Sequence, residues 1–219
     1  MGLESPTPAL APGGLRDLSR LIPAGGVSRW EFEQSPDDSW DANGGSVTGA
    51  TYTTTAIRGG YSLDFDGSGD EFVVPHDSSI SYSDDFTISV WINFDGLTDD
   101  YPRIITKGQG DGGNYELYYH TGDNEYRFNS SNTTIESGVS RTDGTWTHLV
   151  GRVDSGTGSI FINGDEKASG SFSAPENTED LFIGSKSGSG FVNGQIDDPR
   201  IYDSPLSDSR ITDIFNGDE

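Results

Sequence analysis

The sequence predicts an all-β protein built as a sandwich of two antiparallel sheets, and three observations lead to this fold class. Apolar and polar residues alternate over Phe86–Phe94, many short strand-like segments recur between Gly-rich turns, and no helical crossovers separate them. Many short strands without crossover helices are typical of a β-sandwich or jelly roll. The length of 219 residues suits one such domain, since all-β sandwiches commonly run to about 200–250 residues.

The clearest strand is Phe86–Phe94. Every second residue lies on one face, and that face is apolar throughout: Phe86, Ile88, Val90, Ile92 and Phe94. Trp91 lies on the opposite face among polar residues. This alternation predicts a strand with one buried and one solvated side.

Two hairpins are expected in the second half of the chain. The segments Trp146–Val153 and Ser159–Asn163 flank the turn sequence Ser155-Gly-Thr-Gly158, and Asn163-Gly164 is a strong type I′ turn signal that leads into Asp165–Ser169. Eight further strands are predicted: Ser28–Glu33, Ser62–Asp66, Glu71–Val74, Arg103–Lys107, Tyr115–Tyr119, Tyr126–Asn129, Asp180–Ile183 and Gln195–Tyr202.

One short helix is predicted at the C-terminus. Ser207 is a plausible N-cap, Asp208 lies in the first turn, and Ile211, Ile214 and Phe215 form one apolar stripe.

The chain begins with an extended arm, residues 1–27, which is rich in Pro and Gly and precedes a sandwich domain of residues 28–219. Within the arm, Leu15, Leu18, Leu21 and Ile22 lie in one short segment with helical potential. Terminal segments fray unless they pack against something. We therefore expect these four residues to anchor the protein or to form an oligomer contact.

Composition excludes several classes of function. The chain has no cysteine, which excludes disulfide scaffolds, zinc fingers and thiol nucleophiles. A formal net charge of −23 opposes nucleic-acid binding, because the phosphate backbone is also negative. No apolar stretch approaches the roughly 18 residues of a membrane helix, so we expect no membrane insertion.

The same charge predicts a medium of high salt. The chain carries 36 Asp and Glu residues against 13 Lys and Arg. Like charges on a folded surface repel one another, and concentrated salt screens that repulsion. We interpret the surface as an adaptation to hypersaline conditions; the alternative is a protein that is simply acidic.

Five motifs occur in an order that resembles a known family. They are Trp30-Glu-Phe-Glu33, Ser62–Pro75, Phe86–Ile92, Trp146–Val150 with Ile160–Gly164, and Gly194–Tyr202 followed by Leu206-Ser207. Together they resemble the laminin-G-like jelly roll of the concanavalin A-like lectin and glucanase superfamily over residues 28–216. Pro199 stands where that family usually has an aliphatic residue, and a strand proline implies an edge or a bulge.

The resemblance implies two antiparallel sheets but leaves function open, since the superfamily contains lectins, adhesion domains and glycoside hydrolases. Retaining glycosidases of this fold have a Glu-x-Asp-x-x-Glu pattern, which is absent here. Asp64 and Asp66 lie in a motif that non-enzymatic members also carry. None of the three histidines pairs with an obvious serine, and the family places His148 in a packing role. We expect no catalysis.

The resemblance also implies a structural Ca²⁺, bound by an Asp near the last strand and by backbone carbonyls. Asp197 matches that acidic position, and Asp66 and Asp70 could complete the site. The alternative is that these carboxylates cap turns or are solvated.

Glycan contacts are expected from aromatic side chains, because sugars stack on exposed rings. The candidates are Tyr115, Tyr118, Tyr126 and Trp91. The alternative for most of them is core packing, since aromatic residues are common in strands.

Taken together, these features predict a non-catalytic structural or decoration protein on the capsid or tail of a halophilic archaeal virus. Domains of this type usually work outside cells, and the chain shows no export signal, which a virion protein does not need. We expect a homo-oligomer on the virion surface, in contact with other virion proteins and with host-surface glycans or glycoproteins. The alternative is a carbohydrate-binding or adhesion module of a larger secreted haloarchaeal protein, located outside the cell or at its surface.

Overall fold

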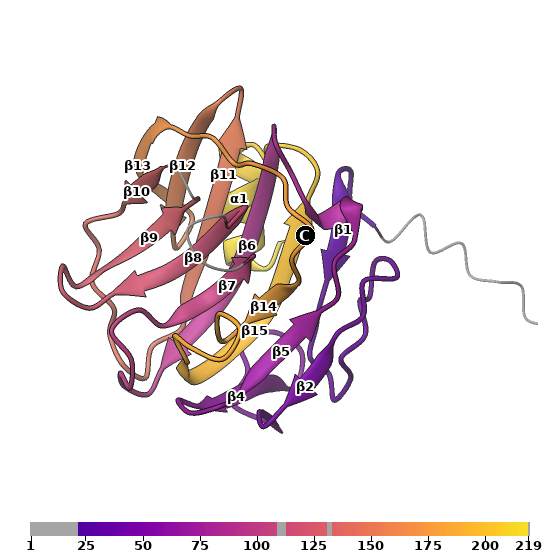
Figure 1. The fold of residues 1–219 in the computed structure, drawn as a ribbon, viewed down its shortest axis with the longest axis vertical. Coiled ribbons are helices and arrows are strands. Elements are labelled where there is room, and N and C mark those ends of the chain that lie inside the picture. Colours follow the sequence, from indigo (N-terminus) through magenta and orange to yellow (C-terminus); the bar gives the residue numbers. More distant parts are fainter. Residues whose placement is uncertain (1–21, 109–112, 131–132, 219) are drawn as a thin grey trace, which may run out of the picture.

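Two antiparallel sheets pack face to face in the computed structural model, which describes residues 22–108, 113–130 and 133–218 (Figure 1). This confirms the predicted sandwich. Within the described residues, no helix is both long and apolar enough to span a membrane.

Sheet A has eight strands. Along the sheet their order is β13 (Asp165–Ser171), β12 (Thr157–Ile162), β11 (Thr147–Asp154), β6 (Phe86–Phe94), β15 (Asn193–Tyr202), β4 (Ser62–Asp66) and β3 (Thr51–Thr53). The eighth strand, β1 (Gly26–Arg29), pairs with β15.

Sheet B has seven strands and lies in front of sheet A in Figure 1. Their order is β10 (Thr134–Glu136), β9 (Glu125–Asn129), β8 (Tyr115–His120), β7 (Arg103–Lys107), β14 (Leu181–Ile183), β5 (Glu71–Val74) and β2 (Ser46–Thr48). A single 3-10 turn, η2 (Ser78–Ile80), follows β5.

The predicted strands are present, and most differences lie at their ends. β4, β5, β6 and β7 have the predicted bounds, whereas β1 begins at Gly26 and ends at Arg29 instead of running from Ser28 to Glu33. Phe32 and Gln34 adopt positive φ angles of 53° and 58°, which ends the extended conformation there. β2, β3 and β10 were not predicted because three residues are too few to show an alternating pattern.

Both predicted turns form. Asp154 pairs with Thr157 across Ser155-Gly156, and Ile162 pairs with Asp165 across Asn163-Gly164. Both central residues of each turn have positive φ, as a type I′ turn requires. The first loop therefore contains two residues instead of the predicted four.

The core lies between the sheets and is filled by the inward-facing side chains of both. The packing is close enough to require glycine at particular positions. A Cβ on Gly184, whose φ is +83°, would lie 2.2 Å from the ring of Phe65. A larger residue at 184 would push the two sheets apart.

The prediction that β6 has only one buried side was wrong, because every residue of β6 is buried. The helix α1 (Asp208–Asn216) lies across the outer face of sheet A, where Ile211 and Ile214 join Val150 and Phe161 in a second apolar cluster. The helix itself has the predicted form, with Ser207 accepting a hydrogen bond from the Arg210 amide as N-cap.

Pro199 lies in a bulge, as predicted. The pairing of β15 with β6 shifts register between Asp197 and Arg200, and Asp198 has a positive φ of 52°. The Pro199 carbonyl accepts a hydrogen bond from the Trp30 amide (3.0 Å). The side chain of Asp198, 1% exposed, accepts hydrogen bonds from Arg29 Nε (2.7 Å) and Arg200 Nε (3.0 Å).

Charge is distributed unevenly between surface and interior. Within the described ranges, Lys167 is the only Lys or Arg in the exposed class, whereas many carboxylates are exposed, among them Asp84, Asp100, Asp165 and Glu179. Most of the described Arg side chains form ion pairs or lie against aromatic rings, so the surface presents mainly negative charge.

We expect salt to stabilise the fold. Raising KCl from about 0.1 M to about 3 M should raise the thermal midpoint, because screening reduces repulsion among the surface carboxylates. Circular dichroism melts measure this, with an equal osmolality of sucrose as the control for exclusion effects. A midpoint that rises equally in sucrose and in KCl would contradict the electrostatic explanation.

Candidate functional site

Two of the predicted glycan-contact residues lie inside the core. Tyr115 is fully buried and donates a hydrogen bond to the Ile80 carbonyl (3.0 Å), and Tyr126 is 2% exposed. Both are members of the cluster between the sheets. Their rings present no surface to a ligand, so the structure favours the core-packing alternative for both.

Trp91 points away from the core, but it is covered. Its ring lies 5.7 Å from that of Phe215 at the end of α1 and 4.9 Å from His148. Only 4% of Trp91 is exposed. His148 thus has the expected packing role, although its Nε2 also lies 2.8 Å from Ser89 Oγ, a buried pair that was not foreseen.

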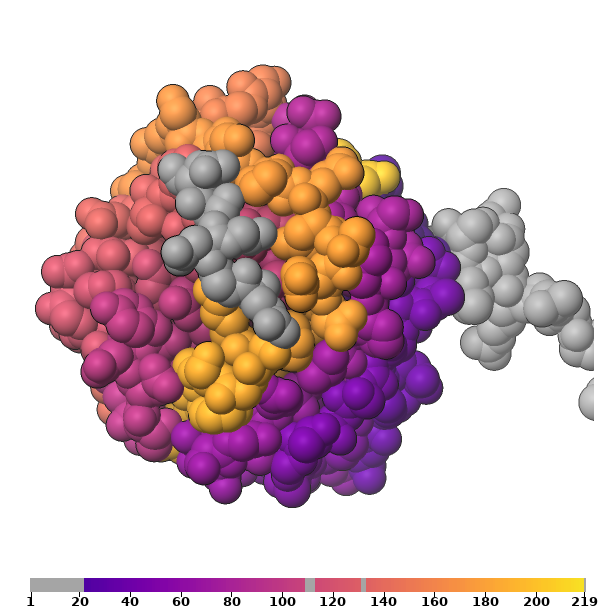
Figure 2. All heavy atoms as spheres, viewed as in Figure 1, coloured from indigo at the N-terminus to yellow at the C-terminus, as the bar shows by residue number. Residues whose placement is uncertain are grey.

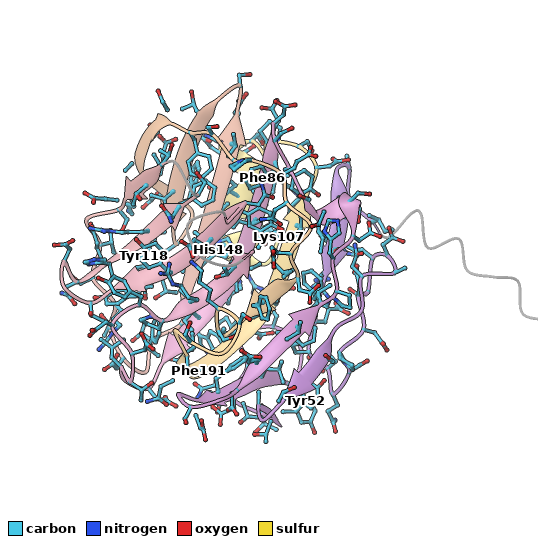
Figure 3. All side chains as sticks on the ribbon, in the orientation of Figure 1. Tyr52, Phe86, Lys107, Tyr118, His148 and Phe191 are labelled. Atoms are coloured by element: carbon cyan, nitrogen blue, oxygen red, sulfur yellow. The ribbon has the colours of Figure 1, made fainter. Side chains whose placement is uncertain are left out.

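Tyr118 lies on the outer face of sheet B, where Figure 3 labels it. The Arg103 guanidinium lies 4.3 Å from its ring centroid and covers it. Tyr118 is therefore 6% exposed. Arg103 is held in place by an ion pair with Glu116 (2.8 Å).

Tyr101, which sequence reasoning missed, is the one large apolar side chain in the exposed class among the described residues, at 44%. It precedes β7, and its ring centroid lies 5.0 Å from His120 and 6.5 Å from Tyr118. The signal was present in Asp99-Asp100-Tyr101-Pro102, an aromatic residue outside any alternating segment. No strand pattern required that ring in the core.

A hollow of about 490 Å³ adjoins Tyr101 in the chain, lined by Leu97, Thr98, Asp99, Asp100 and Thr121. Asp99 holds the loop, because its carboxylate accepts hydrogen bonds from the amides of Tyr101 (3.0 Å) and Gly190 (3.1 Å). The Thr121 hydroxyl donates to the Asp100 carbonyl (2.9 Å). Asp100 is exposed, and its carboxylate can accept hydrogen bonds from a ligand.

We call this area the Tyr101 surface and define it as Tyr101, Arg103, Tyr118, His120 and the five residues that line the hollow. It combines an exposed ring with carboxylate and hydroxyl groups. Its cation, Arg103, is already paired with Glu116. An uncharged, hydroxyl-rich ligand matches this chemistry better than an anion.

The structure does not bring the three predicted calcium ligands together. Asp66 pairs with Asn193, and Asp197 lies four residues further along β15, about 13 Å away at the usual strand rise. Asp70 accepts a hydrogen bond from the Asp66 amide (2.8 Å). No group of three or more acidic or histidine side chains in the described ranges could hold a metal. Calcium stays a prediction.

Asp197 anchors a loop. Its Oδ2 accepts hydrogen bonds from the amides of Ile57 and Arg58, both at 2.9 Å, while Oδ1 has no hydrogen-bond partner among the described residues. Arg58 in turn donates to the carbonyls of Ile214 (2.7 Å) and Phe215 (2.9 Å) at the end of α1. Burial raises the pKa of Asp197 to about 7, and the neighbouring Asp198 acts in the same direction.

The predicted anchor residues fall mostly elsewhere. Leu15, Leu18 and Leu21 lie outside the described residues, and Ile22 is half-buried beside Gly26 and Trp40.

Comparison with known proteins agrees with this fold. The family model of the concanavalin A-like lectin/glucanases superfamily matches residues 66–212. Comparison with curated protein sequences gave no match.

Several solved structures are similar. Domain 4 of AbnA, a GH43 extracellular arabinanase from Geobacillus stearothermophilus in complex with arabinotriose, shares 22% identity at a TM-score of 0.70, covering 87% of this chain and 98% of that one. A Trypanosoma rangeli sialidase shares 18% identity at a TM-score of 0.69, over 89% of this chain and 33% of the sialidase.

The binding domain of Paraclostridial Mosquitocidal Protein 1 shares 20% identity at a TM-score of 0.68, over 88% of this chain and 52% of that domain. The chain thus spans about a third of the sialidase and about half of the toxin domain. At these identities the similarity concerns the fold.

We predict that the Asp197→Asn substitution changes how stability depends on pH. Because the folded state raises this pKa to about 7, it binds the proton more tightly than the unfolded chain does. The Asp197 contribution therefore falls as pH rises from about 4 to about 7. The free energy of unfolding of the variant, relative to wild type, should rise by on the order of 1–3 kcal/mol between about pH 5 and pH 8.

Urea denaturation at several pH values measures this difference, with Asp66→Asn as the control because Asp66 is exposed. A wild-type–variant difference that stays constant with pH would contradict the prediction. Thermal melts of wild type and Asp197→Asn with and without a chelator test the calcium prediction. If Asp197 binds the ion, chelation should lower the melting temperature of wild type and leave that of Asp197→Asn unchanged.

Proposed function

Because the chain belongs to the concanavalin A-like lectin/glucanase superfamily, we propose that it is a non-catalytic carbohydrate-binding domain that holds a neutral sugar at the Tyr101 surface. The observation that carries this proposal is the exposed Tyr101 ring, which directly follows in the chain residues 97–100 of a hollow lined by hydroxyl and carboxylate groups. The arabinanase domain, which was solved with arabinotriose, supports it by analogy of fold.

In the proposed binding mode, the Tyr101 ring and the Asp100 carboxylate contact different groups of the sugar. An aromatic ring offers a flat apolar face against which the C–H groups of a sugar pack. The Asp100 carboxylate accepts hydrogen bonds from sugar hydroxyl groups, and such charge-assisted bonds are roughly twice as strong as neutral ones. Asp99 and Asp100 together repel an anionic ligand, which favours a neutral sugar.

The proposal that the domain has no catalytic activity rests on what the candidate groups do. The Ser89–His148 pair is buried beneath Trp91 and α1, where no substrate reaches it. The Asp64 carboxylate on β4 accepts a hydrogen bond (2.6 Å) from Gln195, its pairing partner on the neighbouring strand β15. Both sets of residues therefore make packing and strand–strand contacts, which supports the proposal that they have no catalytic role.

We further propose that the domain works on the surface of a halophilic archaeal virus, as part of an oligomer that touches host glycans. The support is the negative charge of the surface, which suits a concentrated salt medium. The second candidate is a module of a larger secreted protein, which the near-complete coverage of one domain of an extracellular arabinanase favours.

Removing the Tyr101 ring should weaken sugar binding. We expect Tyr101→Ala to weaken binding to neutral glycans by tenfold or more, whereas Tyr101→Phe keeps the ring and should bind within a factor of about two; tenfold corresponds to about 1.4 kcal/mol. A glycan array in concentrated KCl identifies the ligand, and titration calorimetry measures both variants. Equal binding by wild type and Tyr101→Ala would show that the Tyr101 surface is not the site.

The anchoring proposal predicts that residues 22–219 alone fold but do not assemble. Light scattering in concentrated KCl should find the full chain associated and the shortened chain monomeric. The shortened chain should keep its glycan binding, since the Tyr101 surface lies outside the removed segment. Association that is unchanged by the truncation would overturn the anchoring role of Leu15, Leu18 and Leu21.

A further inference from the structure

A buried lysine meets a side-chain amide at the end of β7. Lys107 is the last residue of β7, is fully buried and is labelled in Figure 3. Leu181, the first residue of β14, pairs with Lys107, so the segment just before β14 passes close to the lysine. Asn177 lies in this segment, and its Oδ1 atom accepts a hydrogen bond from Lys107 Nζ (3.4 Å).

The Asn177 side chain is held on both sides. Its Oδ1 accepts a hydrogen bond from the Glu179 amide (3.2 Å), and its Nδ2 donates one to the Lys107 carbonyl (3.3 Å). The Ser81 hydroxyl fixes the backbone, because it accepts from the Asn177 amide (3.1 Å) and donates to the Asn177 carbonyl (3.0 Å). The amide carbon Cγ therefore lies within about 4.6 Å of the lysine nitrogen, since a C=O bond is about 1.2 Å long.

The residue that follows the lysine fits the same contact. Gly108 has a φ of +106°, and a Cβ at this position would lie 2.5 Å from Asn177 Nδ2. Any residue other than glycine would push the amide away from the backbone at this point. Glycine thus allows the amide nitrogen to lie directly against the chain beside Lys107.

The lysine nitrogen has neutral acceptors, one of which can take a proton. It donates to the Glu179 carbonyl, to His76 Nδ1 (3.1 Å) and to the Asn177 oxygen. Burial lowers the pKa of Lys107 to about 8, although Asp180 and Glu179 act in the opposite direction. A substantial share of the amine is therefore unprotonated at mildly alkaline pH, and an unprotonated amine is a nucleophile. His76 Nδ1 is within reach of the proton that the amine must lose.

We propose that Lys107 and Asn177 form an intramolecular isopeptide bond. The Lys107 ammonium group passes one proton to His76 Nδ1, and the free amine attacks Asn177 Cγ. A bond forms between Nζ and Cγ, and the bond between Cγ and Nδ2 breaks. Of the three ammonium protons, one stays on the new amide and two leave with Nδ2 as ammonium. No atom is oxidised or reduced, so the step needs no co-reactant.

The surroundings favour this step. The Glu179 amide already donates to the oxygen on which negative charge develops when Cγ becomes tetrahedral. A hollow of about 410 Å³ gives the released ammonium a path to solvent. Its lining residues are His76, Ser78, Ser81, Glu176, Asn177 and Thr178. In Figure 2 the segments that contribute these residues adjoin on the surface shown.

The bond takes the role that a disulfide has in other proteins. The sequence contains no cysteine. A covalent link between β7 and the segment before β14 joins residues that are far apart in the chain, which restricts the unfolded chain and so stabilises the fold. The link lies apart from the Tyr101 surface, and the proposal does not depend on the function proposed for that surface.

Mass spectrometry of the denatured full chain tests the proposal. We expect wild type to be lighter than its sequence by the mass of one ammonia molecule. After digestion with trypsin, residues 104–127 should stay joined to residues 168–186, because trypsin does not cleave after an acylated lysine. Fragmentation should place the link between Lys107 and Asn177. A wild-type mass equal to that of the sequence, or a link at another position, would overturn the proposal.

Two variants that cannot form the bond serve as controls. Asn177→Ala and Lys107→Met should both have the full mass of their sequences. Asn177 is half-buried, so Asn177→Ala should fold even if Lys107→Met does not. An Asn-Gly step such as Asn163-Gly164 can also lose ammonia by forming a succinimide, but that loss would persist in both variants. A mass deficit that persists in Asn177→Ala would overturn the proposal.

A third variant tests the proton transfer. His76→Ala should lower the linked fraction at least tenfold at an equal time after synthesis, because a positioned proton acceptor commonly accelerates such a step by about 10²-fold or more. The linked fraction is measured from the two masses of the intact chain. An unchanged linked fraction in His76→Ala would overturn the role of His76 in the proposed step.

Discussion

The bulge in β15 fixes the segments on the outer side of sheet A, because two adjacent buried carboxylates in it accept hydrogen bonds from separate parts of the chain. Asp198 accepts hydrogen bonds from the side chains of Arg29 on β1 and Arg200 on β15. Asp197 accepts hydrogen bonds from the backbone amides of Ile57 and Arg58. Arg58 then reaches the end of α1 through the carbonyls of Ile214 and Phe215. Buried carboxylates need such partners, so the N-terminal strand, one loop and the C-terminal helix are fixed around one point of a central strand.

This arrangement decides which surfaces remain for a ligand. With α1 held across sheet A, Trp91 is covered. The exposed Tyr101 ring lies instead in the loop that leads into β7. Loops on a rigid sandwich are common places for binding, because their side chains are not committed to the core.

Local sequence patterns predicted much of the fold. The strand β6, the Asn163-Gly164 turn and the Ser207 cap each depend on a few neighbouring residues, and the structure has all three, although β6 is buried on both faces. The bulge at Pro199 followed from one missing backbone donor. The three-residue strands were missed because they are held by their neighbours in the sheet, and their own residues carry no periodic signal.

By itself, the sequence determined that the chain forms a two-layer sandwich, because strand periodicity and turn chemistry are local properties. Only the tertiary structure decided which aromatic rings meet solvent. Tyr115 and Tyr126 belong to the core, Arg103 covers Tyr118, and α1 covers Trp91. Tyr101 is the one ring of these in the exposed class, although Arg103 also lies 5.6 Å from its centroid. The physical reason is that the exposure of a ring depends on whether a segment from elsewhere in the chain packs over it. The local sequence around the ring does not contain that information.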